Sequence, residues 1–156
     1  MTTETRYLAP DRFSRRVMNP IVAGLARIGV GLLGAHELRI RGRRTGEWRK
    51  VPVNPLTVDG TTYLIAPRGN TEWVRNLRAA GTGELRLGRR TTAFAASEVT
   101  DASVAAPLLQ AYLRRWESEV GRYFDGLSAD APLDEFVAAA PSYPVFALDS
   151  AVASAA

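Results

Sequence analysis

Apolar residues near the start of the chain recur at the spacing of an amphipathic helix. Between residues 10 and 31, the apolar residues that lie three or four positions apart are Phe13, Val17, Ile21, Leu25 and Ile28. This spacing places them on one face of an α-helix. We therefore expect a helix that packs on the core of the domain. Because arginines occupy its other faces, the alternative is a basic helix that lies on an anionic membrane surface.

The middle of the chain alternates apolar and polar residues with the period of two that is typical of β-strands. Glu37–Arg41 has the pattern of a half-buried strand, Gly42–Gly46 that of a hairpin loop, and Arg49–Val58 that of the return strand. The pair Asp59-Gly60 favours a tight hairpin turn. We expect a third strand over Thr61–Ala66 after that turn.

The pattern then changes to a short helix followed by two strands. Asn70 or Thr71 is suited to cap a helix that stops near Gly81. Strands are expected over Glu84–Leu87 and Thr91–Val99.

A longer helix follows, and a last strand ends the predicted fold. Thr100 or Asp101 caps this helix, and Tyr143–Leu148 is the last strand. The predicted core face of the helix is Val104, Leu108, Leu109, Tyr112, Leu113 and Trp116.

Together these elements predict a small α+β barrel of about six mainly antiparallel strands with peripheral helices. A doubly wound α/β fold is not expected, because its strands alternate with crossover helices after a Gly-rich turn and this chain has no G-x-G-x-x-G. The length of 156 residues fits a single domain over 1–156. Within it we expect the helix at 10–31, a barrel core at 36–149 and a frayed tail at 150–156.

Composition removes most of the usual catalytic groups. The chain has no cysteine and a single histidine, His36. Disulfides, thiolate metal ligands and a cysteine nucleophile are excluded, and we expect no metal site. If the chain is an enzyme, a bound cofactor must carry the difficult chemistry. The absence of cysteine and of an apolar leader over Met1–Pro10 favours a cytoplasmic protein, with contact at the inner membrane face as the alternative.

The densest cluster of charge lies in the first predicted hairpin. The net charge is +4, and four cations fall within eight residues: Arg43, Arg44, Arg49 and Lys50. Flanking glycines allow a tight loop whose N–H groups face a ligand, and arginine forks bind phosphate. Because neighbouring residues of a strand point to opposite faces, we expect only one of Arg49 and Lys50 to join the loop. The hairpin is an anion-binding loop or simply a solvated basic turn.

A second candidate segment joins a strand end to a helix start, over Ala66–Leu77. The free N–H groups of the helix start and the side chain of Arg68 are suited to contact an anionic cofactor. Trp73 and Asn76 share one helix face. Trp73 is alternatively an ordinary core residue.

The two segments, in this order, resemble the deazaflavin-dependent nitroreductase family, whose members are split-β-barrel reductases that use coenzyme F-420. The resemblance covers Leu38 to Leu148. The matching residues are Gly42 to Gly46, Arg49, Pro52, Val53, Trp73, Asn76, Leu77 and Pro144-Val145-Phe146. The chain departs from the family pattern at Arg68 to Glu72, where many relatives have a longer, glycine-rich loop.

The resemblance implies a coenzyme site and a function. The implied coenzyme-binding residues are Arg43, Arg44, Thr45, Gly46, Arg49, Lys50, Val51, Pro52, Val53, Ala66, Pro67, Arg68, Gly69, Asn70, Trp73 and Asn76. The implied substrate-binding residues are Tyr112, Trp116, Tyr123 and Phe124. The implied reaction transfers hydride from reduced coenzyme F-420 to an electron-poor small molecule such as an activated enone, a quinone or a nitroaromatic. The proton comes from solvent or from a tyrosine, for which Tyr123 is the candidate.

Two other functions are consistent with the sequence. A split-barrel oxidoreductase that binds flavin mononucleotide (FMN) would share the fold and the phosphate site. A non-catalytic basic barrel that binds nucleic acid is less favoured, because exposed aromatic residues should then interleave with the cations. Near the basic cluster the sequence offers Trp48 and Trp73 alone. The oligomeric state is left open.

Overall fold

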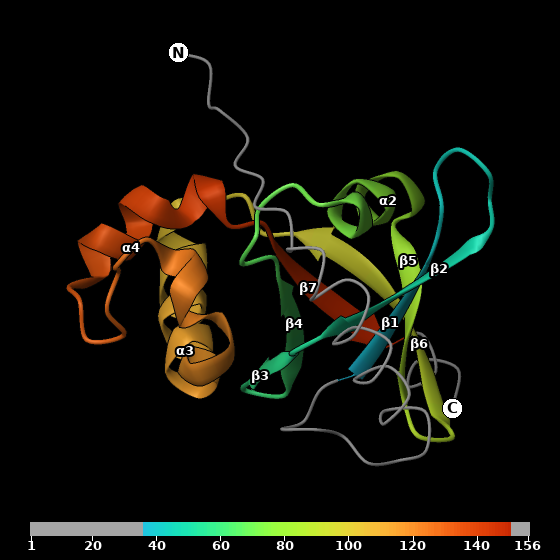
Figure 1. Ribbon diagram of the computed structural model, residues 1–156, viewed down its shortest axis with the longest axis horizontal. Coiled ribbons are helices and arrows are strands. Elements are labelled where there is room, and N and C mark those ends of the chain that lie inside the picture. Colours follow the sequence, from blue (N-terminus) through green and yellow to red (C-terminus); the bar gives the residue numbers. More distant parts are fainter. Residues whose placement is uncertain (1–35, 151–156) are drawn as a thin grey trace.

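A curled, seven-stranded antiparallel sheet forms the centre of the molecule (Figure 1). The computed structural model describes residues 36–150. The strands are β1 (His36–Arg41), β2 (Trp48–Val53), β3 (Leu56–Val58), β4 (Thr61–Ile65), β5 (Thr82–Leu87), β6 (Arg90–Glu98) and β7 (Val145–Ser150). Their order in the sheet is β2-β1-β5-β6-β7-β4-β3, and every pair is antiparallel.

Helices lie around this sheet. They are α2 (Glu72–Ala80), α3 (Ala102–Val120) and α4 (Leu133–Ala139), with short 3-10 helices at Gly121–Phe124 and Ala140–Ser142. In Figure 1, α3 and α4 lie together at one side of the sheet, and α2 lies near the end of the β1–β2 hairpin. No helix in the span 36–150 is long and apolar enough to cross a membrane.

The two edge strands of the sheet, β2 and β3, are consecutive in the chain. Only Asn54 and Pro55 separate them, yet β2 pairs with β1 and β3 pairs with β4. The prediction of one continuous strand over Arg49–Val58 is therefore wrong. Proline has no N–H to donate to a neighbouring strand, and Pro55 marks the break between the two strands. β2 and β3 are therefore the two edges of one curled sheet. The predicted α+β split barrel is confirmed, with seven strands in place of about six.

The predicted hairpin at Asp59-Gly60 is confirmed. Both residues have positive φ, 49° and 81°, as a type I′ turn requires, and Val58 pairs with Thr61 across it.

Gly83 in β5 is required for a different reason, because a side chain would not fit there. A Cβ on Gly83 would lie 2.9 Å from the Arg39 carbonyl oxygen and 2.8 Å from the Phe94 ring, so only glycine lets β5 pass so close to β1.

The buried side chains form two clusters. The first lies between the sheet and α2 and contains Leu38, Ile40, Leu64, Ala66, Val74, Leu77, Phe94 and Phe146. The second is built mainly by α3, α4 and the segments around them, and it includes Leu109, Tyr112, Leu113, Trp116, Phe124, Phe136 and Tyr143. Leu38 and Ile40 of β1 are buried as the sequence predicts, but Glu37 is buried as well, so the alternation along β1 is incomplete.

The long helix begins where the sequence predicts it. Asp101 is its N-cap and accepts a hydrogen bond from the N–H of Ser103 at 2.9 Å. The predicted core face is buried except for Val104, which is 52% exposed. Val104 lies about 100° around the helix axis from buried Ala105, and its prediction as a core residue is wrong.

Some of the structure was not predicted, and some predictions cannot be placed. The sequence pattern did not indicate α4 or the two 3-10 helices. A helix of seven residues shows less than two turns of periodicity, so its pattern is weak. The predicted helix at 10–31 and the tail beyond Ser150 lie outside the described residues.

Candidate functional site

A cavity of about 420 Å³ lies between the β1–β2 hairpin and the start of α2. The predicted coenzyme-binding residues that line it are Arg43, Arg44, Thr45, Arg49, Lys50, Val51, Arg68, Trp73 and Asn76. It is also lined by Ile40, Gly42, Thr71 and Glu72, which are not among the coenzyme-binding residues that the family resemblance implies. The predicted residues outside its lining are Gly46, Pro52, Val53, Ala66, Pro67, Gly69 and Asn70.

The lining of the cavity is strongly cationic. Five basic residues, Arg43, Arg44, Arg49, Lys50 and Arg68, contribute to it together with a single carboxylate, Glu72. A concave surface with one sign of charge attracts and holds ions of the opposite sign. Both Arg49 and Lys50 line the cavity, although we expected only one of them to join the loop. The arrangement is suited to an anionic ligand of small-molecule size.

The loop that carries the first two arginines is closed on itself by hydrogen bonds. The N–H of Gly42 donates to the Glu47 carbonyl oxygen at 2.7 Å, and the N–H of Gly46 donates to the Gly42 carbonyl oxygen at 2.9 Å. Gly46 has φ of 75°, a conformation that glycine adopts without strain. The Thr45 hydroxyl accepts from the N–H of Glu47 at 3.2 Å, which leaves its own hydrogen available to a ligand.

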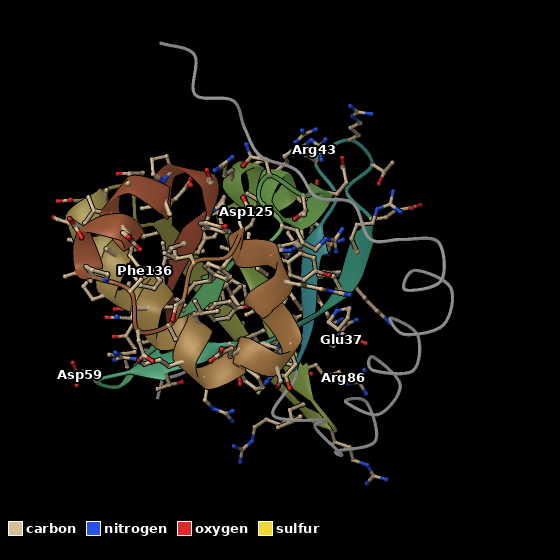
Figure 2. The ribbon with its side chains drawn as sticks, turned by 60° about the vertical axis from the view of Figure 1, so that its left-hand side comes forward. Glu37, Arg43, Asp59, Arg86, Asp125 and Phe136 are labelled. Atoms are coloured by element: carbon tan, nitrogen blue, oxygen red, sulfur yellow. The ribbon has the colours of Figure 1, made fainter. Side chains whose placement is uncertain are left out.

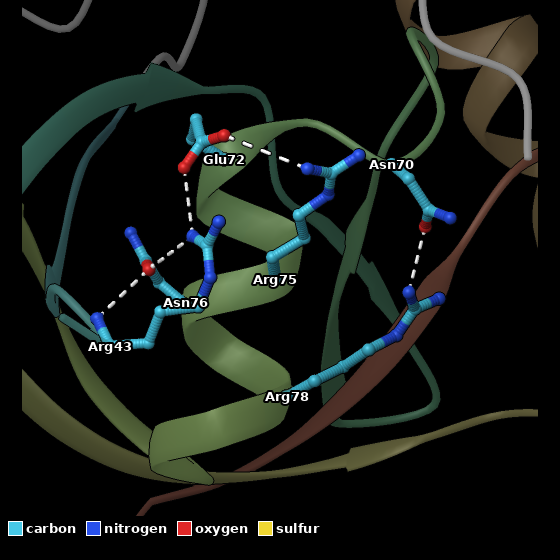
Figure 3. A network of polar contacts seen from close by, with 6 residues as sticks. All are labelled: Arg43, Asn70, Glu72, Arg75, Asn76 and Arg78. Carbon is cyan, nitrogen blue, oxygen red and sulfur yellow. Dashed lines mark hydrogen bonds and ion pairs between the residues drawn. The ribbon is translucent and has the colours of Figure 1, made fainter.

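Helix α2 holds this loop in place through Asn76 (Figure 3). The side-chain oxygen of Asn76 accepts from the backbone N–H of Arg43 at 3.0 Å and from its guanidinium at 2.9 Å. Asn76 is 5% exposed, so both bonds are partly shielded from water. The amide therefore fixes the backbone and side chain of Arg43 at the cavity.

Glu72, at the start of α2, binds the same arginine. Its carboxylate accepts from the Arg43 guanidinium at 2.8 Å and lies 3.9 Å from the guanidinium of Arg75. The hydrogen bond from Arg43 holds the pKa of the Glu72 carboxyl below its usual range. Glu72 is thus ionised at neutral pH. Its carboxylate is bound to the guanidinium of Arg43, one of the cations that line the cavity.

The opposite side of α2 carries a separate polar network. Arg78 donates two hydrogen bonds of 2.8 Å to the Glu98 carboxylate and one of 2.8 Å to the side chain of Asn70. In Figure 3, Asn70 and Arg78 lie across the helix from Arg43 and Asn76. The Asn70 side chain is therefore engaged away from the cavity.

Trp73 combines the two interpretations that the sequence left open. It lines the cavity and is half-buried. Its ring also packs against Phe146, with ring centroids 6.1 Å apart and a tilt of 53°. Trp73 is thus part of the core on one side and a wall of the cavity on the other.

The structure places the four candidate substrate-binding aromatics elsewhere. Tyr112, Trp116 and Phe124 are buried in the cluster around α3, and Tyr123 packs against that cluster. None of the four lines the cavity. Figure 2 separates the same two regions, with Arg43 at the hairpin and Phe136 among the helices.

Specific contacts hold these aromatics in their cluster. The Phe124 ring stacks on the Tyr143 ring with centroids 4.4 Å apart. The Trp116 indole N–H donates to the Pro55 carbonyl oxygen at 3.2 Å. Burial raises the pKa of the Tyr112 hydroxyl, which keeps it neutral. These side chains are therefore part of a packed core.

No group of three or more histidine, cysteine, aspartate or glutamate side chains suited to a metal ion occurs within residues 36–150. Apart from the Glu72 carboxylate, the polar side chains that line the cavity are those of arginine, lysine, threonine and asparagine. These are donors for phosphate and carboxylate ligands.

The curled antiparallel sheet defines a split-barrel protein, and its basic cavity is suited to an anionic ligand. A family model described as F420H(2)-dependent quinone reductase matches residues 13–128. The chain belongs to this family, because the match spans more than half of its length and includes the hairpin loop and α2. It is an oxidoreductase whose cofactor is coenzyme F-420. A search of curated proteins found no sequence match.

Solved structures share the fold at low sequence identity. An F420-H2 dependent reductase, FDR-A, is 16% identical with a TM-score of 0.54, over 74% of this chain and 94% of that chain. A conserved hypothetical protein from Mycobacterium tuberculosis is 13% identical with a TM-score of 0.54, over 75% and 72%. A candidate pyridoxamine 5'-phosphate oxidase from Listeria innocua is 11% identical with a TM-score of 0.52, over 76% and 84%. These likenesses confirm the split-barrel fold.

Proposed function

We propose that the chain binds reduced coenzyme F-420 in the basic cavity and transfers its hydride to a quinone. The observation that carries this proposal is the set of five basic residues around a cavity of about 420 Å³. A volume of this order is usual for a small-molecule site. The description of the family favours a quinone over the activated enones and nitroaromatics that the sequence also allowed.

The residues of the cavity fit the chemistry of the coenzyme. Arg43, Arg44, Arg49 and Lys50 would hold its phosphate and its acidic tail, since arginine forks bind such groups through paired N–H bonds. Trp73 supplies an apolar wall for the deazaflavin ring. We keep the backbone over Val51–Val53 and Ala66–Asn70 as the proposed edge of the ring site.

The coenzyme, when bound, supplies a hydride, and a proton from solvent completes the two-electron reduction of a quinone to a hydroquinone. The protein's own contribution is to bind and orient. Asn76 fixes Arg43 before the ligand arrives, so less freedom is lost on binding. Holding the two reactants within reach of each other supplies much of the rate.

A fluorescence titration of the full chain with oxidised coenzyme F-420, run in parallel with FMN, tests the proposal. Saturable binding with a clear preference for the deazaflavin is the expected result. Preferential binding of FMN would support the FMN oxidoreductase instead. Binding of neither, with salt-dependent binding of single-stranded nucleic acid, would support the non-catalytic basic barrel.

The acceptor is tested by steady-state kinetics with a quinone, a conjugated enone and a nitroaromatic. We expect the highest kcat/KM with the quinone. An enzyme that reduces the enone or nitroaromatic faster would keep the cofactor assignment and overturn the choice of acceptor.

Tyr123, the candidate proton donor, is tested in the same assay. Its hydroxyl accepts a hydrogen bond from Arg122 at 2.7 Å, and it does not line the cavity. We therefore expect Tyr123→Phe to change kcat by less than about two-fold, since a general acid typically contributes far more. A loss of a hundred-fold or more would restore the catalytic role of Tyr123.

A further inference from the structure

The carboxylate of Glu72 lies where the anionic group of a ligand would meet Arg43. It binds the Arg43 guanidinium at 2.8 Å, and both residues line the cavity. Figure 3 shows the carboxylate between Arg43 on one side and Arg75 on the other. A phosphate or carboxylate ligand that uses the same N–H groups of Arg43 must compete with it.

We propose that Glu72 is an internal competitor for the anion-binding side chain of Arg43 and thereby sets the affinity of the coenzyme site. On binding, the ligand takes the place of the Glu72 carboxylate on Arg43, and the carboxylate turns to Arg75. This inference deepens the proposed function and rests on its assumption that the cavity binds an anionic coenzyme.

Because Glu72 is exposed, such an exchange costs little free energy. Its side chain is 70% exposed, so the carboxylate regains water when it leaves Arg43. Arg75 already lies 3.9 Å away, one helical turn further along α2. The released charge therefore has a second cationic partner within reach.

Arg43 itself does not have to move in this exchange. Asn76 continues to hold both its backbone N–H and its guanidinium. The fork stays aimed at the cavity while its partner changes from a side chain to a ligand. Competition of this kind weakens binding without disturbing the geometry of the site.

A weaker site suits a coenzyme that is consumed as a substrate. The reduction of a quinone by this protein oxidises the coenzyme. After hydride transfer, the oxidised coenzyme must therefore leave, so that a different enzyme can reduce it again. Affinity differences appear mostly in the rate of dissociation. A carboxylate that competes for Arg43 shortens the time for which the spent coenzyme stays bound.

A purely structural salt bridge would give the opposite result. If Glu72 served only to position Arg43, its loss would loosen the loop and weaken the binding of anions. The sign of the change in affinity therefore separates the two roles.

The test is a titration of wild type and Glu72→Gln with oxidised coenzyme F-420 and, separately, with inorganic pyrophosphate. Glu72→Gln should bind the coenzyme about two- to five-fold more tightly, the range that corresponds to the loss of an exposed ion pair. The matched control is Glu135→Gln, which removes the same charge from the first turn of α4, remote from the cavity. It should leave both dissociation constants within experimental error.

A second variant tests the exchange of partners. Arg75→Gln should weaken coenzyme binding about two-fold in the wild-type background, because the displaced carboxylate loses its new partner. The same change in Glu72→Gln should have no effect, and this coupling is what a double-mutant cycle measures. High salt should shrink every difference, since exposed charges are screened.

The outcomes separate this inference from the proposed function. Unchanged or weaker binding by Glu72→Gln, or an equal gain in Glu135→Gln, overturns it. If no variant binds the coenzyme but Glu72→Gln binds pyrophosphate more tightly than wild type, the proposed function fails and the competition is supported. If neither probe binds to any variant, the cavity is no anion site and both fail.

Discussion

The two ends of the molecule are built from different chemistry. The end formed by the β1–β2 hairpin, α2 and the segment before α2 presents five cationic residues around a cavity, and the buried side chain of Asn76 holds one of them, Arg43. The end formed by α3 and α4 buries its aromatic rings against one another and against Tyr143. The first end is therefore suited to an anionic ligand, and the second forms a packed core. The predictions below test that division, beginning with the largest effect.

The largest expected effect is a loss of stability at the α3 end. Phe124→Ala removes a ring that is 1% exposed and stacked on Tyr143, and it should lower the free energy of unfolding by about 3–5 kcal/mol. Urea unfolding followed by circular dichroism measures this loss. The contrasting variant is Trp48→Ala, whose ring is partly exposed beneath Arg41 and should contribute only about 1 kcal/mol.

Coenzyme binding is the second readout for Phe124→Ala. The folded fraction should bind coenzyme F-420 with the wild-type dissociation constant, because the cavity does not include this residue. A stable Phe124→Ala variant with impaired turnover would instead place the α3 aromatics in the substrate site, as the family resemblance implies.

The second prediction concerns Arg49, which lines the cavity. Its loss should change the affinity for the coenzyme and not the free energy of unfolding. Arg49→Ala should weaken coenzyme binding by about 1.5–3 kcal/mol if Arg49 makes a charged hydrogen bond to phosphate. The fluorescence titration measures it. Arg89→Ala, an exposed arginine at the β5–β6 turn, is the control with the same change of charge. Equal dissociation constants for Arg49→Ala and wild type would return the hairpin to a solvated basic turn.

Much of this division was available from the sequence. Period-two alternation predicts β1, and Asp59-Gly60 predicts the hairpin that leads into β4. The glycine and arginine pattern of the hairpin, followed by the Trp73 to Leu77 helix, indicated most residues of the cavity. These features are local, so a short segment of chain contains the information.

Other features depend on contacts between distant segments. Pro55 signals a break, but only the fold shows that β3 pairs with β4 while β2 pairs with β1. Aromatic residues on α3 have the same apolar pattern whether they face a cavity or the core. Glu72 has the ordinary position of an acid at a helix start, and its contact with Arg43 joins residues 29 positions apart.

The third prediction concerns Asn76, which connects helix α2 to Arg43 in the hairpin loop. Asn76→Ala leaves the backbone N–H of Arg43 without its acceptor in a partly shielded place, which should lower the free energy of unfolding by about 1–3 kcal/mol. It should also weaken coenzyme binding, because Arg43 loses its fixed position.

The control for Asn76 is Asn70→Ala. Asn70 is bonded to Arg78 on the other side of α2, so its loss should leave coenzyme binding unchanged. Chemical denaturation and the coenzyme titration together report both quantities. Weaker coenzyme binding in Asn70→Ala would show that this side chain belongs to the site after all.

The smallest expected effect lies within α3 and tests how sharply burial divides one helix. Val104→Ala removes methyl groups from a side chain that is 52% exposed, and alanine is the better helix former, so stability should change by less than about 0.5 kcal/mol. Leu109→Ala, at a fully buried position of the same helix, should cost about 2–5 kcal/mol. If Val104→Ala costs as much as Leu109→Ala, an apolar partner covers Val104 in solution, and the α3 end is also a binding surface.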